Sequence, residues 1–143
     1  MSPSHVLVPL DGSPLADDAL THALDTYDSR VTVLNVVTPL DATMSEGGVL
    51  EPDADREAAA HDRAERQVER ARERAAAADR TVGTAVESGD PADAILGFVD
   101  DHDVDHVVMG GHGGEHGRVA RRLLGTVATA VVGEAPVSVT VVR

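Results

Sequence analysis

Glycines and arginines are concentrated in one short segment of the chain, between Gly110 and Arg122. An apolar run ends there in five glycines over eight positions, and arginines follow at positions 118, 121 and 122. Glycines let backbone N–H groups converge on one small volume, because no Cβ atom intervenes. Converging N–H groups bind anions, and so does a helix N-terminus such as the one predicted after Gly125-Thr126. This segment is therefore a candidate phosphate-binding loop.

The basic cluster stands out because the chain as a whole is strongly acidic. It has 25 acidic and 12 basic residues and a formal net charge of −13, and every basic residue is arginine. Acids are spread along the whole chain, and Ala and Val largely replace bulky apolar residues. We interpret this composition as adaptation to a high-salt cytoplasm, where charge repulsion is screened; an ordinary acidic protein is the alternative. The charge disfavours sequence-independent binding to nucleic acid.

The length and composition also set the class of protein that we expect. A chain of 143 residues suits one domain, residues 1–143, with a core of its own. No apolar run is long enough to span a bilayer, and no leader pattern precedes the first apolar segment. The absence of cysteine fits a reducing compartment. We therefore expect a cytoplasmic protein without a membrane partner.

Short apolar runs alternate with helical patterns along the chain. Strands are predicted at residues 5–9, 30–37, 81–86, 104–109 and 136–142. Helices are predicted to begin at Pro14 and Pro91, with Ser13 and Asp90 as the caps before the two prolines. Two more are predicted from Arg56 to Arg80 and from Thr126 to about Gly133. This alternation predicts an α/β fold with parallel strands joined by right-handed crossovers. In such sheets ligands bind beyond the carboxyl ends of the strands, here between the loops after the first and fourth strands.

Three other patterns could carry chemistry. His112-Gly-Gly-Glu-His116 has the spacing of some zinc peptidases, but its glycines oppose the helix that must bring both histidines onto one face. Asp11 would suit a phospho-acceptor of the receiver type, which also needs a lysine that this chain lacks. The acids and histidines at 102–106 could hold a metal, although a solvated turn before a strand fits them better. No catalytic triad or carboxylate pair can be assigned from spacing.

Six segments, taken together, resemble the universal stress protein family over essentially the whole chain. They are Val-Leu-Val-Pro-Leu-Asp-Gly-Ser (6–13), Leu-Asn-Val-Val (34–37), Gly-Asp-Pro (89–91), Asp-His-Val-Val-Met-Gly (105–110), Leu-Leu-Gly-Thr-Val (123–127) and Pro-Val-Ser-Val-Thr-Val-Val (136–142). The resemblance implies a three-layer α/β sandwich of the adenine nucleotide alpha hydrolase-like type, with a five-stranded parallel sheet of order 3-2-1-4-5. It also implies a homodimer joined through the C-terminal strand.

ATP-binding members of this family carry Gly, two residues, Gly, nine residues, then Gly-Ser or Gly-Thr. Gly110 and Gly113 match the first part here, and Gly125-Thr126 match the last. Eleven residues separate the two parts, or ten if Gly114 closes the first part. The motif is thus present but longer by one or two residues, which would lie at positions 114–117.

The resemblance implies that ten residues bind the nucleotide: Pro9, Leu10, Asp11, Val36, Met109, Gly110, Gly113, Gly125, Thr126 and Val127. The first three would line the adenosine end, and Val36 would pack on the adenine. Met109 and Gly110 would contact the ribose and the first phosphates. The last four would hold the polyphosphate through backbone N–H groups and the threonine hydroxyl. From charge alone, Arg118 and Arg121 are further candidates.

These observations leave two functions open. The first is a stress-response or signalling module that binds ATP or AMP, with Mg²⁺ on the phosphates and at most slow hydrolysis. The second is a dimeric interaction protein of the same fold that does not bind nucleotide. The glycines, the Gly125-Thr126 pair and the arginine cluster favour the first.

Overall fold

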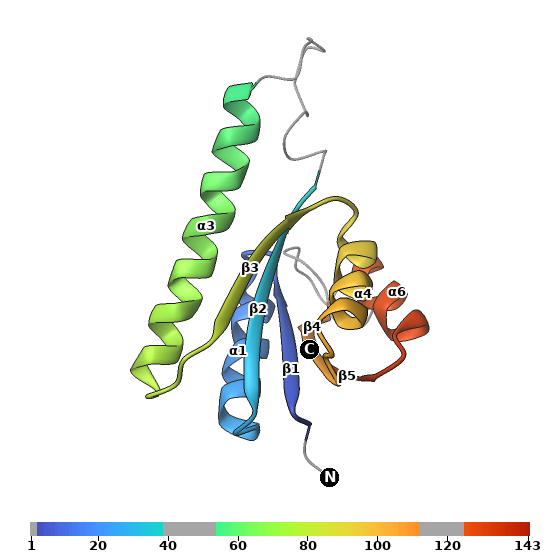
Figure 1. Cartoon of the computed structure of the whole chain (residues 1–143). Helices are drawn as coiled ribbons and strands as arrows, with labels where there is room; N and C mark the ends of the chain where they lie inside the picture. The colour runs from blue at the N-terminus through green and yellow to red at the C-terminus, as the bar shows by residue number, and fades with distance from the viewer. Residues whose placement is uncertain (1–2, 39–53, 112–124) are drawn as a thin grey trace.

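The computed structural model describes residues 3–38, 54–111 and 125–143. Its elements follow one another as β1 (His5–Leu10), α1 (Pro14–Thr26), β2 (Arg30–Val37), α3 (Ala54–Ala77), β3 (Gly83–Ser88), α4 (Pro91–Asp101), β4 (His106–Gly110), α6 (Thr126–Glu134) and β5 (Ser138–Val142). The strands form one parallel sheet in the order β3-β2-β1-β4-β5 (Figure 1). This confirms the predicted α/β class and strand order.

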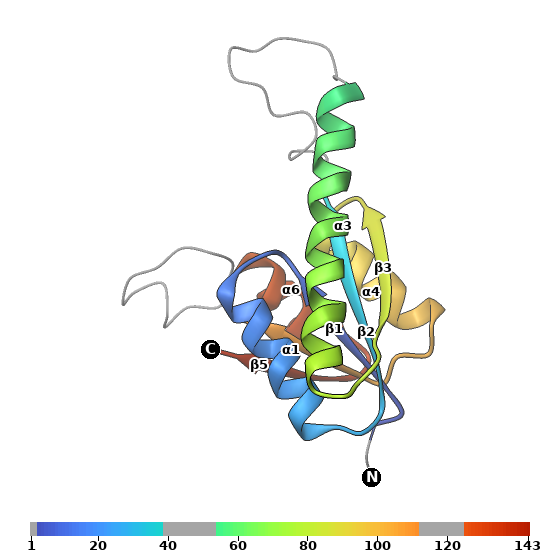
Figure 2. The ribbon, with the colours of Figure 1, turned by 90° about the vertical axis from the view of Figure 1, so that its left-hand side faces the viewer.

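Helices cover both faces of the sheet, as a three-layer sandwich requires. α1 and α3 lie together on one face (Figure 2), and α4 and α6 lie on the other (Figure 1). Side chains of β1 alternate between the two resulting cores: Val6 and Val8 pack with α1 and α3, and Leu7 packs with α4 and α6. Parallel strands covered on both faces are apolar along their length, which explains the near-continuous apolar runs.

Helix caps fix where two helices begin at the carboxyl edge of the sheet. Ser13 caps α1, and its hydroxyl accepts a hydrogen bond from the Ala16 amide at 3.2 Å. Asp90 caps α4, and its carboxylate accepts from the Asp93 amide at 3.0 Å. Both were predicted as caps, because a polar side chain before proline suits a helix start.

The helix α3 lies close to the sheet because its buried face consists of small residues. Ala60, Ala64 and Ala71 are almost fully buried along it. The helix ends three residues before the predicted end at position 80, where Asp79 adopts a φ of 60° and the Arg80 amide donates to the Ala75 carbonyl at 2.8 Å. The Arg80 guanidinium then ties this turn to the carbonyl groups at the end of α1.

The strands β3, β4 and β5 begin two residues later than the sequence pattern predicts. Apolar residues precede each strand, whereas pairing with a neighbour decides where the strand begins. Gly83, for example, is the first residue of β3 with a partner, Thr32 in β2. In the described ranges no helix is both long and apolar enough to cross a membrane.

Candidate functional site

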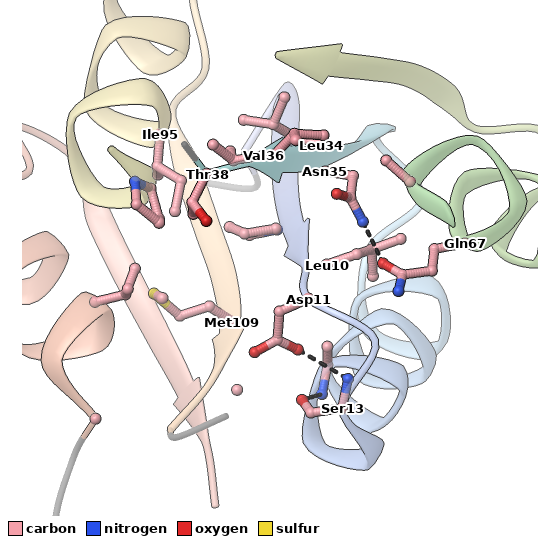
Figure 3. A pocket seen from close by; sticks show the side chains of 18 of the residues that line it. Leu10, Asp11, Ser13, Leu34, Asn35, Val36, Thr38, Gln67, Ile95 and Met109 are labelled. Atoms are coloured by element: carbon pink, nitrogen blue, oxygen red, sulfur yellow. Dashed lines mark hydrogen bonds between the residues drawn. The ribbon is translucent and has the colours of Figure 1, made fainter. Parts of the chain in front are cut away.

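A cavity of about 380 Å³ lies at the carboxyl ends of the central strands (Figure 3). Its walls come from the ends of β1, β2 and β4, from one face of α3, and from the first turns of α4 and α6. This is the switch point of the sheet, because the chain runs from β1 to β2 on one side and reaches β4 on the other. Ligands of parallel α/β proteins bind at this position.

One wall of the cavity is apolar and continuous with the core beneath α4 and α6. Leu34, Ile95 and Met109 belong to that core and are at most 5% exposed, and Val36 and Val127 pack against it. In Figure 3 Ile95, Val36 and Met109 lie around the same space. A wall of this kind can bury the faces of a flat apolar or aromatic group.

The start of α6 supplies hydrogen-bond donors to the cavity. The first bond of its N-terminal turn runs from the Thr129 amide to the Gly125 carbonyl at 2.9 Å. The amides of Thr126, Val127 and Ala128 therefore have no partner within the helix, and all three residues line the cavity. Free amides and the positive end of a helix dipole favour an anionic group there.

Gly110 and Gly125, at the two ends of the candidate phosphate-binding loop, also make contacts that stabilise the fold. The Gly125 amide donates to the Gly111 carbonyl at 2.6 Å, so it is already engaged in this conformation. A Cβ atom at Gly110 would lie 2.9 Å from the Leu15 Cβ and 3.0 Å from the Leu15 carbonyl carbon. Gly110 therefore permits α1 to pack closely on β4, in addition to lining the cavity.

A tight turn after β1 places an exposed carboxylate at the cavity. Asp11 accepts a hydrogen bond from the Ser13 amide at 2.9 Å, and Gly12 between them adopts a φ of +84°. The turn directs the chain into α1 and leaves Asp11 in the cavity wall (Figure 3). Carboxylate oxygens are ligands that Mg²⁺ accepts, usually together with phosphate oxygens.

The wall formed by α3 was not predicted from the sequence. Ala60, Arg63, Ala64 and Gln67 line the cavity from this helix, and Asn35 joins them from β2. Asn35 Nδ2 donates a hydrogen bond to Gln67 Oε1. Among the basic residues of the described ranges, only Arg63 lines the cavity. The helical spacing of Gln67 from the buried alanines was the available signal, since it puts them on one face.

The structure brings nine of the ten predicted binding residues together around this cavity: Pro9, Leu10, Asp11, Val36, Met109, Gly110, Gly125, Thr126 and Val127. Gly113 lies outside the described residues, as do Arg118, Arg121 and the His112–His116 segment. Their common location supports one site, while the role of each residue stays a prediction.

Among the described residues, the ionisable groups with shifted pKa values lie at the amino-terminal ends of β1 and β4, opposite the cavity. Burial lowers the pKa of His5, whose ring nitrogens contact the His102 carbonyl oxygen and the Thr32 hydroxyl. Burial also lowers the pKa of His106. Hydrogen bonds from the Ser4 and His5 amides lower the pKa of Asp105. These contacts hold the N-terminal end of β1 beside β4.

Asp105 and His106, two of the candidate metal ligands at 102–106, make other contacts in this structure. No group of three or more His, Asp or Glu residues in the described ranges is arranged to hold a metal ion. Asp105 is engaged by backbone amides, and His106 contacts the Thr140 hydroxyl at 2.8 Å. The structure therefore favours the turn interpretation of this segment.

Comparison with known proteins assigns the chain to a protein family. Residues 3–143 match the sequence model described as the Universal stress protein family. The chain belongs to this family. Its match to the family covers both the cavity-lining strands and the helices that close over them. No curated protein matches the chain at a significant level.

Solved structures of universal stress proteins share this fold. Universal stress protein UspA from Lactobacillus plantarum is 26% identical, with a TM-score of 0.80 over 100% of this chain and 99% of that chain. An Arabidopsis thaliana family protein, solved with AMP bound, is 19% identical, with a TM-score of 0.70 over 98% and 91%. A universal stress protein in complex with cAMP is 23% identical, with a TM-score of 0.62 over 100% and 98%.

Proposed function

We propose that this universal stress protein binds an adenine nucleotide, ATP or AMP, in the cavity at the carboxyl edge of its sheet. One observation carries the proposal: a single cavity combines an apolar wall at Val36, Ile95 and Met109 with the first-turn amides of α6, which have no partner within the helix. The apolar wall suits a purine, and the amides suit phosphate. The AMP and cAMP complexes of structurally similar family members support the same ligand class.

The residues present also fit a divalent cation on the phosphates. Asp11 lines the cavity with its carboxylate at the turn that precedes α1. The chain carries a net charge of −13, so a polyphosphate would meet unfavourable charge without a counter-ion. Mg²⁺ would offset this repulsion and would be held by Asp11 together with the phosphate oxygens.

We also propose a biological role in which the protein binds nucleotide rather than turning it over rapidly. We propose a stress-response or signalling module whose state depends on the bound nucleotide, with at most slow ATP hydrolysis. The described cavity residues offer backbone donors, side-chain hydroxyls and amides, one carboxylate and one arginine, and no histidine among them could act as an acid or base.

A homodimer through β5 is a second proposal, carried by the position of that strand. β5 pairs with β4 on one side and forms the edge of the sheet. Val139, Val141 and Val142 remain partly exposed along it. An apolar edge strand invites pairing with another chain. Light scattering in molar KCl should give twice the mass of the chain; a monomer mass at every concentration tested would contradict the dimer.

The nucleotide proposal and its alternative, an interaction protein without nucleotide, differ in what the purified protein carries. The protein should be purified in molar KCl, denatured, and the released small molecules identified by mass spectrometry. We expect ATP or AMP in a substantial fraction of the molar amount of protein. Release of no nucleotide, together with no binding on adding ATP with Mg²⁺, would favour the alternative.

A further inference from the structure

Asn35 is a buried amide in the cavity wall whose hydrogen-bonding capacity is only partly used. Asn35 is 5% exposed and lines the cavity. Nδ2 donates to Gln67 Oε1, whereas Oδ1 has no hydrogen-bond partner in the described part of the chain. In Figure 3 the Asn35 oxygen lies on the side away from Gln67. Buried amide oxygens are almost always hydrogen-bonded in folded proteins, so we expect a bound ligand to donate a hydrogen bond to Asn35 Oδ1.

The composition of the chain makes this pair exceptional. Asn35 is its only asparagine, and Gln67 is its only glutamine, against 25 acidic residues. The two residues are 32 positions apart, yet they contact one another in the cavity wall. A chain that uses carboxylates almost everywhere else has kept two neutral amides at one place. A neutral amide can offer a donor and an acceptor together without repelling phosphate.

Gln67 lies close to the turn after β1 as well as to Asn35. Gln67 extends from α3 between β2 and the turn after β1, where a Cβ atom at Gly12 would lie 2.6 Å from Gln67 Nε2. Gly12 adopts a φ of +84°, which also favours glycine. The turn thus leaves room for the Gln67 amide. With Gln67 Oε1 accepting from Asn35 Nδ2, the Asn35 oxygen is left to the cavity.

The pair also lies at the end of the cavity where a base would be. The free amides of α6 lie beyond β4, whereas Asn35 and Gln67 lie on β2 and α3, with β1 between them. A nucleotide with its phosphates at α6 would therefore extend toward the end of β2, where Val36 faces α4 and α6 and Asn35 faces α3. This step rests on the proposed nucleotide function.

We propose that the Asn35–Gln67 pair selects the base, with Asn35 Oδ1 accepting a hydrogen bond from the exocyclic amine of a 6-aminopurine. A 6-oxopurine presents a carbonyl oxygen at the same position, so two acceptors would face each other in a buried site. A site built to hydrogen-bond one group discriminates strongly against an analogue that lacks it. Gln67 acts as the positioning residue, because it holds the Asn35 amide in the required orientation.

Calorimetric titration with ATP and inosine triphosphate (ITP) in molar KCl with Mg²⁺ tests the inference. ITP differs from ATP in the 6-oxo group and the accompanying N1 proton, while its ribose and phosphates are identical. We expect the wild-type protein to bind ATP at least about tenfold more tightly than ITP, as one matched rather than mismatched buried hydrogen bond implies. Equal affinities would overturn the base-selection inference but leave nucleotide binding standing. Binding of neither ligand would overturn the proposed function itself.

Substitutions separate base selection from a merely structural contact. Asn35→Leu should reduce the ATP preference to within about twofold, because the acceptor is gone. Gln67→Leu should also reduce it, because the Asn35 amide can then rotate. Gln67→Glu keeps an acceptor for Asn35 Nδ2, so the preference should persist even though added negative charge weakens both ligands.

Arg80→Ala provides a control for destabilisation alone. It removes hydrogen bonds at the far end of α1 and should lower the unfolding temperature without changing the ATP-to-ITP ratio. If Asn35→Leu does not fold, the two Gln67 variants decide the question. Retention of the full ATP preference in a folded Asn35→Leu or Gln67→Leu protein would contradict the inference, as would its loss in Gln67→Glu.

Discussion

Gly111 and Gly125 are joined by a hydrogen bond from the Gly125 amide to the Gly111 carbonyl, with an N···O distance of 2.6 Å. The same Gly111 donates its amide to the Val142 carbonyl at 2.8 Å. The end of β4, the start of α6 and the end of β5 are therefore held together at the cavity. This contact positions the first turn of α6 beside the end of β4. A glycine motif longer than the family pattern can thus still present the α6 amides to a ligand.

Replacing Gly125 should remove nucleotide binding. In Gly125→Val a branched side chain would stand at the cavity wall beside the first-turn amides of α6, where it would crowd the phosphates. Gly133→Ala is the matched control in the same helix, because an added Cβ atom there meets nothing within 4 Å. Calorimetry should show no ATP binding to the first variant and unchanged binding to the second. Wild-type affinity in Gly125→Val would place the phosphates elsewhere.

Replacing Gly110 should destabilise the fold, independently of any ligand. The new Cβ atom in Gly110→Ala would lie 2.9 Å from the Leu15 Cβ, so α1 must shift away from β4. We expect a loss of about 1–3 kcal/mol in the free energy of unfolding, as for other overpacked sites. Gly97→Ala, in the interior of α4 with open space around it, should instead gain about 0.5–1 kcal/mol. Urea unfolding measures both, and equal effects would refute the packing role.

The stability of the protein should fall as the pH drops below about 6.5. Burial lowers the pKa of His5 and His106 below their ordinary value of 6.5, so the unfolded chain takes up protons first. The unfolded state binds more protons in this window, and the free energy of unfolding therefore decreases with falling pH. His106→Gln should flatten the dependence between pH 7 and 5.5. An equally steep dependence in His106→Gln would exclude this assignment.

The melting temperature should rise with potassium chloride concentration. With 25 acids and 12 bases on a small protein, repulsion acts over a screening length of about 10 Å at 0.1 M salt and about 3 Å at 1 M. Thermal melts between 0.1 M and 3 M KCl should show this increase, and ATP should partly restore stability at low salt because it binds only the folded state. A midpoint that stays constant or falls would rule out the high-salt interpretation of the composition.

Periodicity and capping residues were enough to predict the elements of this fold. Proline after Ser13 and after Asp90 marked two helix starts, and apolar runs marked the strands that the structure contains. Family resemblance supplied the strand order and nine of the residues around the cavity. Strand starts were less accurate, because pairing with a neighbouring strand decides them.

The α3 wall could not be read from the sequence in the same way. Helical spacing puts Gln67 on the face of Ala60 and Ala64, but it does not tell how far along β2 that face reaches. The contact between Gln67 and Asn35 depends on the angle and depth at which α3 packs on the sheet. The close approach of Gly110 to Leu15 likewise arises only when α1 is docked. Both features depend on tertiary packing, which local patterns do not encode.

Titration of ATP into the native protein, in 2–3 M KCl with Mg²⁺, tests the central claim most directly. The cavity predicts saturable binding at one site per chain, with a heat signal that disappears in Gly125→Val and persists in Gly133→Ala. Saturation at that ratio would support the cavity formed by β1, β2, β4 and α6 as the nucleotide site. No heat and no change in melting temperature with either ATP or AMP would contradict the account.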